Sequence, residues 1–316
     1  MVASLSRAMA ATRQWSEISD EIVAFDAATL RRQPVRKASV VEHFRAAGNE
    51  RAARLVEAMP DLEGNLDPGY VDRLLVSVHC EMQRISEEFQ HGQRVVELLR
   101  PVLAAVRGAR PPRVVRIVDI GCGTGFVIRW LAANGNLGGD VELLGVDYNE
   151  ALVTEARRLA AAESLRCTFK VANAFRLEPP ATIYLSTGVV HHFRDEALQE
   201  FFARHEGPET MAFLHFDFLP SPLAPFGSWL FHTVRMRSAL AKHDGLVSAI
   251  RAHPSAALRS AAKAGTSSFA LAMFNTRLWR LPIPRAFHTL VGIRPALREA
   301  LVEALGGRAT RLGQFE

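Results

Sequence analysis

The sequence predicts a protein of the α/β class, with a mostly parallel sheet that follows an all-helical N-terminal region. Two observations lead to this prediction. Between residues 113 and 217, short apolar runs rich in β-branched residues alternate with segments of helical periodicity, as expected when helices connect parallel strands. Residues 1–112 contain no convincing strand, and their apolar residues recur at helical spacing.

The composition is ordinary for a soluble protein with a full hydrophobic core. Of the 316 residues, 48% are hydrophobic and 22% are charged. Cys80, Cys122 and Cys167 lack the spacing of a disulfide framework or a zinc site, so we expect no bound metal. No apolar run reaches the roughly 18 residues of a membrane span, and no signal peptide is evident. These features predict a cytoplasmic protein with no membrane partner. The net charge of +5 comes from dispersed arginines, so no nucleic-acid partner is expected.

The most informative stretch is residues 114–126, an apolar run that leads through a glycine-rich turn into a helix. Such a turn directs free backbone N–H groups and the positive end of a helix towards one ligand. A dinucleotide-binding turn has its third glycine three residues after the second. Here Gly121, Gly123 and Gly125 are evenly spaced, and position 126 is Phe. Asp119 would repel a pyrophosphate, but it suits a ligand that carries an ammonium group.

This Asp-x-Gly-x-Gly-x-Gly pattern, at residues 119–125, resembles motif I of the class I S-adenosyl-L-methionine (SAM)-dependent methyltransferases. The resemblance covers residues 113–293 and implies a Rossmann-like, seven-stranded mixed sheet with a terminal antiparallel hairpin. Strands at 268–276 and 286–293 would form that hairpin. The resemblance also implies that SAM is the cofactor and that the protein is a methyltransferase.

Several expected cofactor contacts follow from the same resemblance. Asp119 would reach the methionine amino group, and Asp147, at the end of a second strand at 141–146, would accept hydrogen bonds from the ribose hydroxyls. Asn173 stands where the family usually has an acid that contacts the adenine amine, and its carbonyl oxygen retains an acceptor. The full expected set is Asp119, Gly121, Cys122, Gly123, Gly125, Asp147, Tyr148, Asn173, Ala174, Phe175 and Thr187.

Histidines are the best candidates for a general base, because their ordinary pKa lies near neutrality. His191 and His192 follow a fourth strand at 181–186, where the family often has such a pair. We favour His192 as the base, with His191 and His215 as the other candidates. The same two histidines would also serve simply to cap the next helix or to fill space. The segment lacks the Asn/Asp-Pro-Pro-aromatic tetrad of nucleic-acid amine methyltransferases, which argues against such substrates.

The acceptor pocket is predicted from two flanking regions. A helix that begins at Asp67 carries a stripe of polar side chains, His79, Gln83, Ser86 and Gln90, which face either the substrate or solvent. An aromatic-rich insertion at 218–253 follows Asp217, at the carboxyl end of the fifth strand, where open α/β sheets bind ligands. We expect His79, Gln83, Gln90 and Asp217 to contact the substrate. Together, the two regions would close over a small, partly apolar molecule.

We therefore expect a helical cap region at 1–112, a SAM-binding domain at 113–293 and a C-terminal helix and tail at 294–316. The predicted reaction is methyl transfer to a small, partly apolar metabolite, most simply at oxygen. A methyltransferase of RNA or protein, or a catalytically silent SAM-binding module, would have the same motif. A divalent ion that helps to bind a phosphorylated substrate, and assembly as a homodimer, both stay open.

Overall fold

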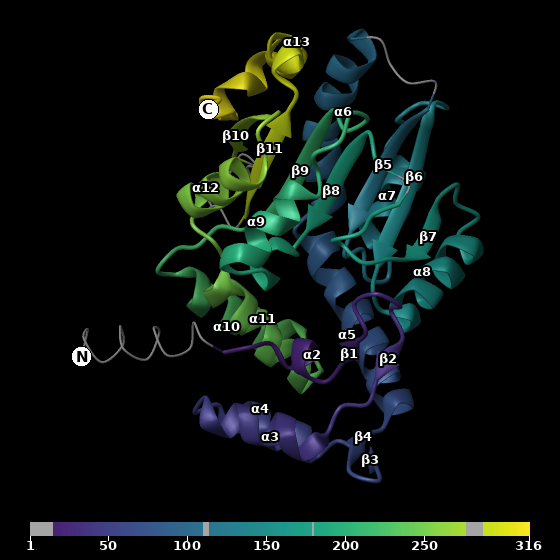
Figure 1. Cartoon of the computed structure of the whole chain (residues 1–316), viewed down its shortest axis with the longest axis vertical. Helices are drawn as coiled ribbons and strands as arrows, with labels where there is room; N and C mark the ends of the chain where they lie inside the picture. Colours follow the sequence, from purple (N-terminus) through teal and green to yellow (C-terminus); the bar gives the residue numbers. More distant parts are fainter. Residues whose placement is uncertain (1–14, 110–113, 179, 276–286) are drawn as a thin grey trace. The chain divides into compact units, whose positions relative to one another are not determined.

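The computed structural model describes residues 15–109, 114–178, 180–275 and 287–316 (Figure 1). These residues fall into two compact units. The first contains residues 15–84 and Pro220–Ala252, and the second contains Ile85–Leu219 and His253–Glu316. The division therefore falls inside a helix, α5 (Pro68–Glu88), and not at residue 112, where the sequence suggested a boundary.

The second unit is built on a seven-stranded mixed sheet, which confirms the predicted fold class. Its strand order is β10-β11-β9-β8-β5-β6-β7, and β11 is antiparallel to both of its neighbours. The other neighbouring pairs are parallel. The predicted hairpin is therefore present, although residues 276–286 between its strands lie outside the described residues. The strands are β5 (Val115–Ile120), β6 (Val141–Asp147), β7 (Thr168–Val171), β8 (Ile183–Thr187), β9 (Ala212–Phe218), β10 (Ala270–Phe274) and β11 (Phe287–Ile293).

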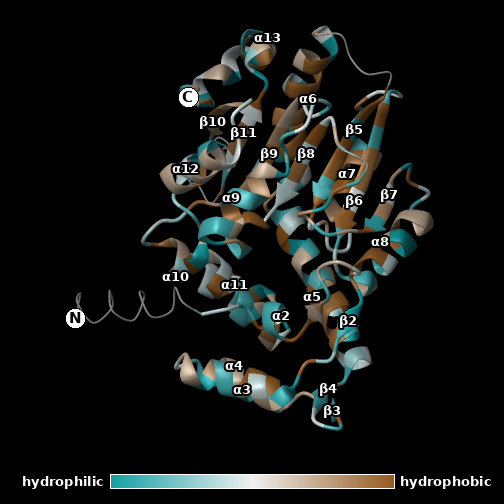
Figure 2. Cartoon of the chain, in the orientation of Figure 1, coloured by the Kyte–Doolittle hydropathy of each residue, from teal (hydrophilic) through white to brown (hydrophobic). Residues whose placement is uncertain are grey.

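Helices cover both faces of this sheet, because its central strands are apolar on both sides (Figure 2). The link between β7 and β8 forms no helix among its described residues. One face of the sheet packs against α6 (His91–Gly108), α7 (Phe126–Asn134), α8 (Glu150–Ala162) and α13 (Arg298–Leu305). The other face packs against α9 (Asp195–Ala203) and α12 (Ser255–Gly265).

Helix α6 belongs to the core of the second unit, whereas the sequence placed it in the N-terminal cap. Leu98, Leu99 and Val102 are completely buried in the same cluster as residues of β5. Gly92 lets α6 approach α7 closely, since a Cβ there would collide with the ring of Trp130. The periodicity of α6 predicted a buried stripe correctly, but a periodic pattern does not identify the surface that buries it.

The first unit is mainly helical, but it is not all-helical as predicted. Two pairs of two-residue strands are antiparallel, and strands this short leave no alternating pattern in the sequence. The strands are β1 (Ala24–Phe25), β2 (Arg32–Gln33), β3 (Asp61–Leu62) and β4 (Asn65–Leu66). The helices of this unit are α2 (Ile18–Glu21), α3 (Lys37–Ala46), α4 (Glu50–Glu57), most of α5, α10 (Ala224–Arg235) and α11 (Ala239–Arg251).

Buried polar contacts hold the segment at 220–252 to the N-terminal helices. The carboxylate of Asp244 in α11 accepts hydrogen bonds from the backbone N–H groups of Ile18 and Ser19, at 2.8 and 3.0 Å. The Ser248 hydroxyl donates to Oε1 of Glu17 at 2.8 Å. The predicted insertion is therefore part of the same unit as the N-terminal region.

Helix α5 begins as predicted. Asp67 Oδ1 accepts hydrogen bonds from the N–H groups of Gly69 and Tyr70, and Pro68 occupies the first helical position. The polar side chains at 79, 83, 86 and 90 form a half-buried flank beside the buried apolar stripe. Their contact with a substrate stays a prediction. No described helix is long and apolar enough to cross a bilayer.

Candidate active site

The glycine-rich turn joins β5 to α7 at the point where the order of the parallel strands reverses. Gly121, Gly123 and Gly125 all have positive φ angles, of 67°, 54° and 75°. A Cβ on Gly121 would lie 2.7 Å from Val189 Cγ2, and a Cβ on Gly125 would collide with the Phe169 ring. Both the backbone conformation and the available space therefore require glycine at these two positions.

Asp119 lies at the end of β5, directly before this turn, and is only 2% exposed. Its Oδ1 atom has no hydrogen-bond partner among the described residues. Burial, and then the nearby charge of Asp147, raise the pKa of this carboxyl group well above its ordinary value. An unpaired buried carboxyl group is costly, so this position suits a ligand that brings a cationic donor, such as the ammonium group of SAM.

Asp147 ends the neighbouring strand, β6, and is held in a fixed orientation. One of its oxygens accepts a hydrogen bond from the N–H of Gly123, and the other accepts one from the N–H of Asn149, both at 2.9 Å. Burial raises the pKa of Asp147, although these hydrogen bonds and the charge of His192 oppose the shift. Each carboxylate oxygen has a further lone pair, so this group can also accept hydrogen bonds from the hydroxyls of a ribose.

The remaining residues expected to bind the cofactor lie on the ends of neighbouring strands. Asn173 follows β7, and its side-chain oxygen accepts a hydrogen bond from the N–H of Phe175 at 2.9 Å, so this oxygen already stabilises a local turn. Thr187 ends β8 with its hydroxyl buried and without a partner among the described residues. Tyr148 is 43% exposed. Burial raises the pKa of the Cys122 thiol well above its ordinary value, which keeps this thiol protonated.

A buried histidine–aspartate pair lies after β8. His191 belongs to a short 3-10 turn, η1 (Val190–His192), and its Nδ1 atom lies 2.8 Å from Oδ1 of Asp217 on β9. The other oxygen of Asp217 accepts the backbone N–H of His191 at 2.9 Å. Both residues are at most 3% exposed. Burial tends to raise the pKa of Asp217, but His191 and the hydrogen bonds to the carboxylate keep it below its ordinary value.

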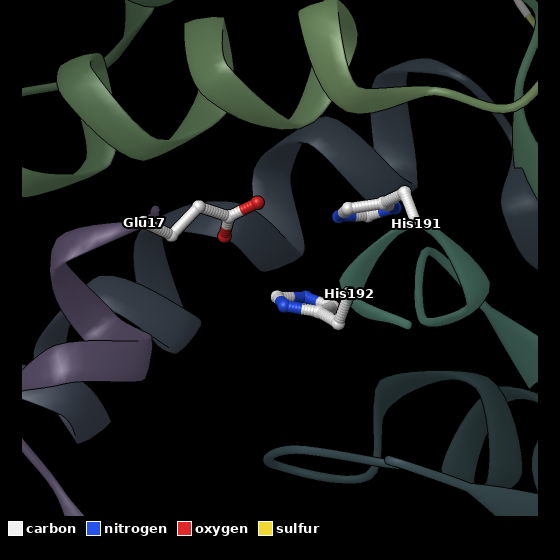
Figure 3. Close-up of side chains that lie close together, drawn as sticks. All are labelled: Glu17, His191 and His192. Carbon is white, nitrogen blue, oxygen red and sulfur yellow. The ribbon is translucent and has the colours of Figure 1, made fainter. Parts of the chain in front are cut away.

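This pair fixes the protonation of the imidazole. An ionised carboxylate only accepts hydrogen bonds, so Nδ1 of His191 carries the proton and Nε2 carries a lone pair. Figure 3 shows the His191 and His192 rings extending from η1. The ring centroids of His191 and His192 lie 4.4 Å apart. Because Asp217 orients the His191 ring and sets its tautomer, this geometry favours His191 as the base, whereas the sequence favoured His192.

His215 does not join this pair, although it lies on the same strand as Asp217. It is completely buried, and its Nδ1 atom lies 2.8 Å from the hydroxyl of Ser186. Aromatic rings from α9 surround it, including those of Phe201 and Phe202. Burial lowers its pKa well below the ordinary value. These surroundings are those of a neutral core histidine.

Two further histidines near Asp217 were not singled out from the sequence. His288 on β11 lies directly opposite Asp217 in the strand register, and its Nδ1 atom is 2.8 Å from the Ser255 hydroxyl. Burial lowers the pKa of His288 to about 4. His253 donates from Nε2 to the Phe193 carbonyl at 2.9 Å. Only the antiparallel register of β9 and β11 places His288 here, and this register cannot be read from either strand alone.

A row of aromatic rings extends from His191. The Phe218 ring lies 5.6 Å from the His191 ring, and the Phe287 ring lies 5.2 Å from that of Phe218. Phe89 and His91, at the junction of α5 and α6, pack edge-on against Phe287. Both ring nitrogens of His91 are buried without a partner among the described residues, and burial lowers its pKa to about 3. These rings therefore form a contiguous apolar row with a few polar atoms.

The comparison with protein families decides the class. Residues 117–206 match a family model described as a methyltransferase domain. This stretch runs from β5 past α9 and includes the glycine turn, both strand-end acids and η1. The chain carries a class I, SAM-dependent methyltransferase domain. SAM is therefore the cofactor of this enzyme. The buried Asp119 suits its ammonium group, and the oriented Asp147 suits its ribose hydroxyls.

Solved structures similar to this methyltransferase are distant in sequence. The plantazolicin methyltransferase BpumL, in complex with a pentazolic desmethylPZN analog and S-adenosylhomocysteine (SAH), is 12% identical with a TM-score of 0.50; the match covers 72% of this chain and 91% of that chain. The magnesium protoporphyrin IX methyltransferase (ChlM) from Synechocystis PCC 6803 is 18% identical, with a TM-score of 0.42. That match covers 82% of this chain and 99% of the ChlM chain. No curated protein matches the sequence. BpumL supports the fold alone.

Proposed function

We propose that this methyltransferase methylates an oxygen atom of a small, partly apolar metabolite, with His191 as the general base. The observation that carries this proposal is the buried pair formed by His191 and Asp217. An alcohol or a weakly acidic phenol loses its proton as the new carbon–oxygen bond forms, so a positioned base accelerates the reaction. The pair supplies such a base with its tautomer already set.

The roles of the two residues differ. The Nε2 atom of His191 takes the proton of the acceptor hydroxyl, and Asp217 stabilises the imidazolium that results, as in other catalytic histidine–carboxylate pairs. Asp217 is thus assigned a positioning role in place of the substrate contact expected from the sequence. His192 lies close enough to Asp147 to influence its pKa, which associates it with the ribose end of the cofactor site.

The cofactor is held by residues at the ends of the central strands. In this proposal Asp119 accepts from the ammonium group of SAM, the glycine turn passes beneath the cofactor, and Asp147 accepts from the ribose hydroxyls. When bound, SAM supplies an electrophilic methyl group. The protein then has to align the acceptor oxygen and exclude water.

The aromatic row supports a partly apolar acceptor. Phe218 and Phe89 are half-buried, and Phe287 between them is buried. These side chains suit the ring or hydrocarbon part of an acceptor whose hydroxyl points to His191. The partnerless nitrogens of His91 would add a polar contact at the far end of the row.

The test is a reaction with SAM that carries a deuterated methyl group, in a metabolite extract from the host. Mass spectrometry should find a labelled O-methyl product that the His191→Ala protein does not form. The His192→Ala protein is the matched control, and it should form the same product. A labelled product methylated at nitrogen or carbon would contradict the assignment to oxygen. SAH binding without any labelled product would favour a silent SAM-binding module.

A further inference from the structure

Helix α10 turns its polar side inward and its apolar side outward, the reverse of an ordinary surface helix. On its inner side, the Ser228 hydroxyl donates to the Gly245 carbonyl of α11 at 2.6 Å. His232 is 6% exposed and donates from Nδ1 to the Ser228 carbonyl at 2.7 Å. A Cβ on Gly245 would collide with the His232 ring, so the two helices are in close contact here. The Ser228 and His232 side chains are therefore satisfied within the protein.

The opposite side of α10 exposes large apolar residues. At about 100° per residue, Leu223, Phe226, Trp229, Leu230 and Val234 project within one arc of the helix. Their exposed fractions are 68%, 62%, 44%, 47% and 71%. The only other exposed residues in this arc are Gly227 and Thr233, so it contains no charged side chain. We call these five apolar residues the outer face of α10. An exposed apolar surface of this kind marks an interaction site.

The chain segment that bears the outer face carries basic residues and no acid. No Asp or Glu occurs from Phe218 to His243, whereas Arg235, Arg237 and Lys242 lie at and after the end of α10. Glu81 of α5 accepts hydrogen bonds from the backbone N–H groups of Arg237 and Ser238, at 3.0 and 3.1 Å. Asp244 is buried and accepts from Ile18 and Ser19. The segment that bears the outer face is therefore cationic in itself, with the Glu81 carboxylate bound at its end, and it complements an anionic surface.

We propose that the outer face of α10 docks onto an anionic lipid bilayer, with the helix lying in the plane of the interface. Phe226, Leu230 and Val234 enter the region between headgroups and acyl chains, and Trp229 lies at the headgroup level. Arg235 and Arg237 lie beside the lipid phosphates. A second copy of the chain is a poorer occupant, because a two-fold interface would bring together two segments that contain arginine and lysine but no acid from 218 to 243.

Vesicle flotation tests this inference independently of the methylation reaction. The wild-type protein should float with vesicles of phosphatidylglycerol and phosphatidylcholine at low salt, and much less with phosphatidylcholine alone. The variant Phe226→Ser/Leu230→Ser/Val234→Ser should lose vesicle binding by about 10²-fold. The matched control is Leu62→Ser/Val302→Ser, which removes two apolar side chains exposed elsewhere, and it should bind as the wild type does. Circular dichroism and thermal melting establish that each variant is folded.

A second pair of substitutions tests the charges. Arg235→Gln/Arg237→Gln should weaken binding to the anionic vesicles about tenfold and reduce its dependence on salt. The inference is overturned if the wild type does not bind anionic vesicles, or if the triple-serine variant binds them equally well. If the wild type does not bind vesicles but sediments as a dimer, and the triple-serine variant sediments as a monomer, the outer face is instead an interface between two copies of the chain. That result also overturns the inference.

Discussion

The buried carboxyl group of Asp119 is energetically unfavourable in its ionised form. Burial and the charge of Asp147 raise its pKa well above the ordinary value. For a carboxyl group whose pKa is raised in the folded state, the protonated form is favoured by folding. The stability gained from protonating Asp119 is therefore fully present below the pKa of the unfolded state. It is lost as the pH rises through the raised pKa of the folded state. Near neutral pH, the cofactor-free enzyme bears this cost, which the proposed contact with the ammonium group of SAM would offset.

Asp119→Asn should make the cofactor-free protein more stable at neutral pH, because it removes a buried ionisable group while keeping its shape. It should also weaken SAH binding by roughly 1–3 kcal/mol, as expected for a lost hydrogen bond to a charged group. Thermal melting with and without SAH measures both effects. Glu299→Gln, at an exposed position on α13, should change neither. Unchanged SAH affinity in Asp119→Asn would contradict the assigned role.

The histidine pair permits a second prediction at the scale of single residues. His191→Ala should lower kcat about 10²–10⁴-fold, the usual effect of losing a positioned base, while SAH affinity is retained. Asp217→Asn should also lower kcat, because the amide no longer fixes the tautomer of His191. His192→Ala should reduce turnover far less. In a pH–rate profile, the inflection due to the base should be absent only from the His191 variant; an inflection that persists would assign the base elsewhere.

At the scale of elements, the sequence predicted most reliably what local spacing determines. The strand, the acid and the glycines at 115–125 predicted the cofactor-binding turn, because a turn of this kind depends only on residues that are close together in the sequence. The packing of α6, the reversed polarity of α10 and the position of His288 opposite Asp217 depend on contacts between distant segments. His191 and His192 look equivalent in the sequence, since only the fold reveals which one reaches Asp217.

The glycine turn gives a prediction for one element. Gly125→Ala should destabilise the protein by about 2–4 kcal/mol, because the new Cβ meets Phe169 at a positive φ angle. It should also weaken SAH binding, since the turn has to move. Gly139→Ala is the matched control, as its Cβ would meet no atom within 4 Å. Denaturant unfolding and calorimetry with SAH provide the two measurements, and equal behaviour of the two variants would mean that the turn tolerates a side chain.

At the scale of the whole molecule, each unit has its own stabilising interactions. The second unit depends on a sheet packed on both faces, whereas the first depends on buried polar contacts as well as on apolar ones. Asp244 is central to the first unit. It accepts from two backbone N–H groups of the N-terminal segment and from Nδ1 of His243 at 2.7 Å. The Nε2 atom of His243 in turn accepts from the side-chain amide of Asn49 at 2.8 Å.

Asp244→Ala should therefore loosen the first unit selectively. The substitution removes the acceptor of the buried N–H group of Ile18, at about 1–3 kcal/mol, and that of the half-buried N–H group of Ser19, at less. Hydrogen exchange should show faster exchange at α2, α4 and α11 and unchanged exchange in β5 and β8. SAH affinity should be retained, because the cofactor residues all belong to the second unit. As a control, Asp72→Asn, at a half-buried surface ion pair with Arg32, should have little effect. Faster exchange in β5 as well would show that Asp244 also stabilises the sheet.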